Sequence, residues 1–95
     1  MGLHTATGQD GTTRITVEGR FDFQVHREFR AVLDGVSSGG RCVVDLSRTS
    51  YLDSSALGML LLLRERCADV RVENASDDVR KVLEIANFQR LFELG

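Results

Sequence analysis

The chain has 95 residues, of which 42% are hydrophobic, and this size fits one compact domain over residues 1–95 with a single core. Its 12 basic and 14 acidic side chains give a formal net charge of -2, so no broad positive field is available to hold a nucleic-acid backbone. We therefore expect no nucleic acid among its partners.

The longest apolar run, residues 56–63, is interrupted by Gly58 and is far shorter than the roughly 20 residues that span a bilayer. Residues 1–10 lack the basic start and apolar middle of a signal peptide. These two features predict a cytoplasmic protein without membrane insertion.

The first strands are predicted at residues 3–7 and 13–18, where Ile15 and Val17 alternate with polar residues. Asp10-Gly11 between them is a turn signal, which favours an antiparallel hairpin. Gly19 is expected to end the second strand, with residues 21–23 forming a loop.

A first helix and a central strand are predicted next. Apolar residues recur at helical spacing from Val25 to Val36, and the helix is expected to end near residues 37–40. Residues 42–46 are short, β-branched and almost continuously apolar, as in a strand covered on both faces. Val70, Val72 and Ala75 repeat the strand signal after a helix that begins near Ser54, which predicts a right-handed parallel crossover.

The last helix is expected to begin at Ser76, a capping residue followed by two acids that suit the positive end of a helix. Asn87 is a plausible left-handed stop, after which Phe88 and Phe92 are expected to close the core. The fold class is therefore α/β, a mixed sheet of about four strands with helices packed against it.

Cysteine and histidine usage indicates neither a metal site nor a cofactor. Cys42 and Cys67 lie in apolar segments away from any Cys-x-x-Cys spacing, which favours small buried thiols over a disulfide or zinc site. His4 and His26 belong to separate elements with no ligand at a suitable spacing.

The helix that begins at Ser54 has a predicted buried face and a predicted exposed face. A step of about 100° per residue groups Ala56, Leu60, Leu63 and Cys67, with Leu57 and Leu61 extending the buried stripe. The opposite side holds Ser54, Ser55, Gly58, Leu62, Glu65 and Arg66. An apolar Leu62 one turn after the small Gly58 suggests a surface that a partner could approach closely.

Asp53, Ser54 and Ser55 at the start of this helix allow two interpretations. Their side-chain oxygens suit plain capping, which is worth about 0.5 to 2 kcal/mol. The same helix entrance also suits a phosphate, because backbone donors and the helix dipole stabilise negative charge there. The residues alone favour capping and leave phosphorylation open.

The chain resembles bacterial anti-sigma factor antagonists of the STAS domain family over nearly its whole length. The most specific match is the strand at residues 43–47 followed by Leu-Asp-Ser-Ser-Ala-Leu-Gly at residues 52–58. Gly-Arg-Phe-Asp at residues 19–22 and the closing segment at residues 82–92 match further family motifs. Phe21 stands where the family usually has Leu, and Ala56 where Gly is frequent.

The resemblance implies that Ser54 is phosphorylated by a GHKL-type serine kinase that is also the anti-sigma factor. A metal-dependent serine phosphatase would reverse the modification. Ser55 is the second choice of acceptor by motif position. Asp53 would orient the hydroxyl or contact the kinase, and Asp22 would lie in a neighbouring loop that shares the binding surface. With Gly58 and Leu62 on the exposed side of the helix, these residues make up the expected partner surface.

The implied mechanism is partner switching. Unmodified protein would bind the anti-sigma factor and release its sigma factor or regulator, and the Ser54 phosphoform would dissociate. No Gly-rich phosphate loop, nucleophile elbow or carboxylate pair is present, so we do not expect an enzyme. The alternative is a STAS subunit that docks on the ATPase of a lipid transporter without phosphorylation. A subunit of a larger stress-sensing assembly is less expected, because such subunits usually carry an additional sensory domain.

Overall fold

A computed structural model describes residues 2–36 and 40–95, and within them the chain forms a sheet of six strands packed against helices. The strands are β1 (Gly2–Thr7), β2 (Thr13–Phe21), β3 (Arg41–Asp45), β4 (Thr49–Leu52), β5 (Asp69–Glu73) and β6 (Glu93–Leu94). The helices are α1 (His26–Gly35), α2 (Ser54–Arg66) and α3 (Asp77–Ile85), with short 3-10 turns η1 (Phe23–Val25) and η2 (Phe88–Arg90).

The sheet is mixed, in the order β1-β2-β3-β5-β6, with β4 paired to the end of β2. The predicted hairpin is confirmed, because β1 and β2 pair antiparallel, and all the other pairs are parallel. The α/β class is also confirmed. The expected number of about four strands is wrong, because the four-residue β4 and the two-residue β6 are too short to show a periodic pattern.

The predicted break at Gly19 is also wrong, since β2 continues to Phe21. Gly19 adopts a φ of +84°, where a side chain would be strained, and the register shifts between Gly19 and Arg20. This irregularity lets one strand pair first with β3 and then with β4. Phe21 is fully buried, which explains why the chain stays extended past the glycine.

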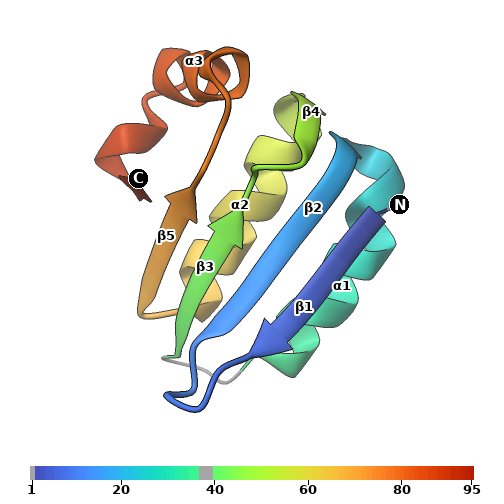
Figure 1. Cartoon of the computed structure of the whole chain (residues 1–95), viewed down its shortest axis with the longest axis vertical. Helices are drawn as coiled ribbons and strands as arrows, with labels where there is room; N and C mark the ends of the chain where they lie inside the picture. Colours follow the sequence, from blue (N-terminus) through green and yellow to red (C-terminus); the bar gives the residue numbers. More distant parts are fainter. Residues whose placement is uncertain (1, 37–39) are drawn as a thin grey trace.

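Figure 1 shows α1 and α2 side by side on one face of the sheet, with α3 beyond the C-terminal end of β5. The core lies between that face and the helices and includes Ile15, Val17, Phe29, Val44, Leu60 and Leu83. α1 ends at Gly35, where Val36 is the extended C-cap, and residues 37–39 of the predicted helix end lie outside the described residues. None of the helices described in the structure is long and apolar enough to cross a membrane.

The buried face of α2 differs in one respect from its prediction. Ala56, Leu60 and Leu63 are buried as expected, but Leu61 is 38% exposed and Met59 is buried instead. Five residues of helix place Leu61 about 140° from Ala56, outside the sector that faces the sheet and α1. Leu57, on the same side as Leu61, is half-buried against the core, so the prediction is wrong for Leu61 and missed Met59.

The two cysteines meet at the end of α2 that is remote from Ser54. Both are buried free thiols, as predicted, with 2.7 Å between the sulfurs of Cys42 and Cys67. Burial, together with the hydrogen bond to Cys67, raises the pKa of Cys42 to about 12. The Cys42 side chain is therefore a neutral thiol at physiological pH.

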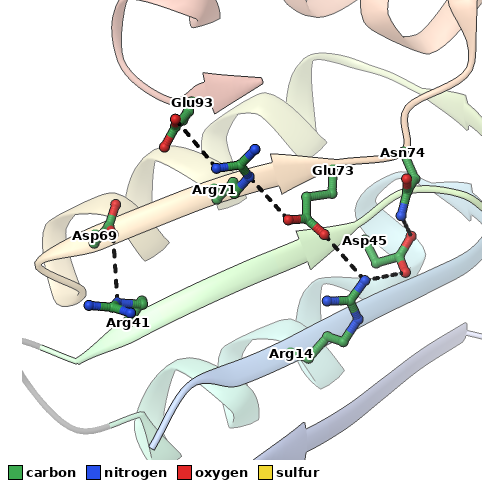
Figure 2. Close-up of polar contacts among 8 residues, drawn as sticks. All are labelled: Arg14, Arg41, Asp45, Asp69, Arg71, Glu73, Asn74 and Glu93. Carbon is green, nitrogen blue, oxygen red and sulfur yellow. Dashed lines mark hydrogen bonds and ion pairs between the residues drawn. The ribbon is translucent and has the colours of Figure 1, made fainter. Parts of the chain in front are cut away.

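The sheet face opposite the helices carries a chain of ion pairs across four strands (Figure 2). Arg14 bridges Asp45 at 3.0 Å and Glu73 at 3.3 Å. Arg71 bridges Glu73 at 3.0 Å and Glu93 at 3.4 Å, which connects the short β6 to the sheet. Alternating charge along this face suits a solvated surface, because each carboxylate has a cation beside it.

We predict that Asp45 makes the stability of the fold sensitive to acid. Partial burial opposes ionisation of Asp45, but hydrogen bonds from Ser47, Arg14 and Asn74 outweigh it and lower the pKa to about 2. Because this pKa is depressed, the contribution is complete above pH of about 4, the unfolded value, and is lost as the pH falls towards 2. Asp45→Asn should lower the free energy of unfolding by about 1 kcal/mol at pH 7 and by almost nothing near pH 2.

Urea unfolding of both proteins between pH 7 and pH 2 measures this difference. Asp69→Asn is the matched control on the same face, because its ion pair with Arg41 is longer, at 3.8 Å, and well exposed. A deficit in the Asp45→Asn variant that stays constant across the pH range would contradict the assignment.

Candidate functional site

The site is built where β2 and β4 end side by side. Their parallel register pairs Arg20 with Tyr51 and Phe21 with Leu52, and an aspartate follows each strand. Phe21 and Leu52 are both buried, so the core fixes this register. Asp22 and Asp53 are thereby brought to the same edge of the sheet, although 31 positions separate them in the sequence.

Asp53 is the N-cap of α2. Its backbone is extended, and its Oδ1 accepts hydrogen bonds from the backbone N–H of Ser55 at 3.1 Å and of Ala56 at 3.2 Å. The Ser55 hydroxyl donates to the same oxygen at 2.6 Å. That hydroxyl bond, followed by the two backbone bonds and the charge of Arg20, outweighs partial burial and lowers the pKa of Asp53. Asp53 is consequently a firmly ionised cap at neutral pH.

The two adjacent serines have different environments. Ser54, the first residue of α2, is exposed, and in the part of the chain that the structure describes its hydroxyl has no hydrogen-bond partner. Ser55 is half-buried and its hydroxyl is engaged by Asp53. Only the Ser54 hydroxyl is therefore free to react without breaking a bond of the cap.

Asp22 is a buried carboxylate that caps η1 and holds the side chain of Arg20. It is only 4% exposed, and its Oδ1 accepts from the backbone N–H of Gln24 at 3.0 Å, which caps η1. Its Oδ2 accepts from Nε of Arg20 at 3.1 Å. The predicted location beside the serine turn agrees with the structure, but a partner could reach little of this carboxylate.

Two residues that the sequence analysis did not single out also belong to this edge. The guanidinium of Arg20 lies over the ring of Tyr51, 4.2 Å from its centre. Tyr51 is exposed, and so is Phe23 on the adjoining η1. Arg20 could have been selected from the sequence because it stands inside the Gly-Arg-Phe-Asp motif at residues 19–22. Its contact with Tyr51 could not be predicted, because it depends on the pairing of β2 with β4.

Gly58 and Leu62 lie on the exposed side of α2, as the helical spacing predicts. Leu62 is 38% exposed, and a Cβ added at Gly58 would meet open space. Leu62 borders a groove of about 230 Å³ between α1 and α2. The groove is lined by Arg30, Leu33, Asp34, Leu62, Glu65 and Arg66.

The sequence also matches known proteins. Residues 4–93 match the family described as Mlab, STAS domain. The STAS-domain containing protein PA14_20770 of Pseudomonas aeruginosa (strain UCBPP-PA14) is 47% identical to this chain, and the alignment covers 98% of this chain and 95% of that protein. The chain belongs to the STAS domain family.

Solved structures share the fold at low sequence identity. The tm1081 protein of Thermotoga maritima, a candidate anti-sigma factor antagonist, has a TM-score of 0.83 and 16% identity, covering 97% of this chain and 84% of that one. The anti-sigma factor antagonist SpoIIAA in its unphosphorylated form has a TM-score of 0.70 and 21% identity, with coverage of 99% and 87%. The phosphorylated form of SpoIIAA, a Bacillus cell fate determinant, has a TM-score of 0.70 and 20% identity, with coverage of 99% and 91%.

We predict that the cap of α2 resides in Asp53 and not in Ser54. Asp53→Ala removes the acceptor of two backbone N–H groups and should lower the free energy of unfolding by about 1 to 2 kcal/mol. Ser54→Ala removes an unbonded hydroxyl and should change it by less than about 0.5 kcal/mol. Chemical denaturation of the two variants measures both values, and a Ser54→Ala loss as large as that of Asp53→Ala would show that the hydroxyl has a structural role.

Proposed function

We propose that this protein is a cytoplasmic anti-sigma factor antagonist, without catalytic activity of its own, that works by partner switching through Ser54. The unmodified form binds an anti-sigma factor that is also a serine kinase and so releases the sequestered sigma factor or regulator. Phosphorylation of Ser54 abolishes this binding. The observation that supports the proposal most directly is the exposed, unbonded hydroxyl of Ser54 beside a cap that does not need it.

The modification transfers the terminal phosphoryl group of ATP. The Ser54 Oγ bonds to the γ-phosphorus, the bond from that phosphorus to the oxygen it shares with the β-phosphate breaks, and ADP leaves. The hydroxyl proton passes to a base of the kinase. A metal-dependent serine phosphatase reverses the step, as water displaces the serine oxygen and inorganic phosphate is released.

The charge of the phosphate is sufficient for the switch. A phosphoserine carries about -1.5 to -2 charges at pH 7. A unit charge about 4 Å from a like charge costs about 4 kcal/mol at an effective dielectric constant near 20. Because about 1.4 kcal/mol is a tenfold change in affinity, one phosphate that faces an acidic or desolvated partner surface can empty the complex.

The proposed binding surface extends from the serine turn along the exposed side of α2. Ser54 and Ser55 begin it, Gly58 lies one turn further, and Leu62 lies at the groove beside α1. Asp53 presents its ionised carboxylate beside Ser54, where it can orient the hydroxyl or contact the kinase. We assign the partner kinase to the GHKL type on the family resemblance.

Phosphorylation of Ser54 is tested directly with ATP and each GHKL-type kinase of the host. One kinase should add a single phosphate, which peptide mass spectrometry should locate on Ser54. Ser55→Ala is the matched control, because it alters the adjacent hydroxyl and should still be modified, whereas Ser54→Ala should not. Modification that persists in Ser54→Ala, or the absence of any phosphate with every kinase, would count against the proposal.

Binding distinguishes the proposal from the docking alternative. Ser54→Ala should bind the kinase as tightly as the parent protein, and Ser54→Asp should bind at least about tenfold more weakly. Equal affinities of the two variants would exclude charge as the switch. Loss of lipid asymmetry on deletion of the gene, together with full rescue by Ser54→Ala, would instead favour a STAS subunit on the ATPase of a lipid transporter.

We predict that Gly58→Arg weakens binding of the partner kinase without destabilising the fold. The added side chain points into open space on a helical position, and arginine has a better helix propensity than glycine by roughly 0.5 to 1 kcal/mol. Stability should therefore be unchanged or higher, while affinity for the kinase should fall at least about tenfold because the close approach is blocked. Calorimetric binding and thermal unfolding give the two readouts. Gly58→Ala is the matched control, because it restores helix propensity with little added bulk.

A further inference from the structure

Arg20 occupies an unusual position at the edge that holds Ser54. Arg20 is the strand partner of Tyr51, and Tyr51 lies three residues before Ser54 in the sequence. The guanidinium carbon of Arg20 lies 4.2 Å from the centre of the Tyr51 ring. Its Nε donates to Oδ2 of the buried Asp22 at 3.1 Å. The side chain is held at two points although it is 61% exposed.

The remaining donors of Arg20 are uncommitted. Only Nε is used by Asp22, and within residues 2–36 and 40–95 the two terminal nitrogens have no hydrogen-bond partner. A guanidinium carries its donors in a rigid planar fork that matches the oxygens of a phosphate. Asp22 and Tyr51 fix one edge and one face of this fork, so less side-chain freedom is lost when the other edge binds an anion.

We propose that Arg20 is the intramolecular receptor for the phosphate on Ser54, with Asp22 and Tyr51 as its positioning residues. This inference rests on the proposed function, because it concerns the modified state of the same serine. The terminal nitrogens of Arg20 donate to the phosphate oxygens, while Nε stays bonded to Asp22. The phosphorylated turn thus gains a bond to its own scaffold.

Two further observations favour this role. The charge of Arg20 acts on Asp53, the residue directly before Ser54, as its contribution to the lowered pKa of that carboxyl shows. The basic residue in the turn directly before β4 is Arg48, whose side chain is paired with Glu18 at 3.3 Å. Arg20 is therefore the better placed of these two cations to meet a phosphate at the start of α2.

The second pKa of the phosphoserine measures this contact. Phosphoserine is incorporated at position 54 by genetic-code expansion, and ³¹P NMR follows its titration between pH 4 and pH 8, so the test needs no kinase. A nearby guanidinium stabilises the dianion, and the parent protein should therefore titrate about half a pH unit or more below the Arg20→Gln variant. Tyr51→Leu, which keeps every formal charge and removes the ring on which the guanidinium stacks, should give an intermediate value.

Arg48→Gln is the matched control, because it removes the same charge from an exposed arginine of the adjoining turn and should shift the value by less than about 0.2 unit. Thermal unfolding of each variant establishes that the proteins titrated are folded. Equal second pKa values in the parent and in Arg20→Gln would overturn the inference. That result would leave the proposed function intact, whereas a Ser54 that no kinase modifies would defeat the proposed function and leave the ³¹P result unchanged.

Discussion

The parallel pairing of Phe21 with Leu52 is the constraint on which the site depends. Both side chains are buried, so a slip of one residue would move an apolar side chain to the solvent face and an aspartate towards the core. Because parallel strands end at the same edge, this register places Asp22 and Asp53 together and starts one helical element after each. The positive φ of Gly19 makes the pairing possible, since it allows β2 to change partners.

The capping of α2 explains how an exposed, unbonded hydroxyl can be maintained at a helix start. An N-terminal turn has unpaired N–H groups, and a serine there is normally used to satisfy them. Here Asp53 accepts from two backbone groups and also holds the Ser55 hydroxyl. Ser54 is consequently left without a structural task, and its modification need not disturb the helix.

Local signals were predictable from the sequence and long-range pairings were not. Ser76 caps α3 through the backbone N–H of Val79, and Asn87 adopts the left-handed conformation, both as the sequence indicated. Each depends on residues within a few positions of it. The contact of Arg20 with Tyr51 depends on the register between β2 and β4. So does the difference in environment between Ser54 and Ser55. Core packing sets this register, and the four residues of β4 are too few for their own polar and apolar pattern to predict it.

The charges at this edge indicate where the energy of the proposed phosphoryl switch would come from. A phosphate on Ser54 would lie beside the ionised Asp53, and like charges about 4 Å apart in water repel by only about 1 kcal/mol. The helix start contributes roughly half a positive charge, and Arg20 contributes a full one. These opposing effects are of similar size, so the free protein has little reason to unfold or rearrange. In the proposed complex the same phosphate would lose its water and the effective dielectric constant would fall, which would make every unmatched charge several times more costly. A switch built this way changes the affinity for a partner far more than it changes the fold that carries it.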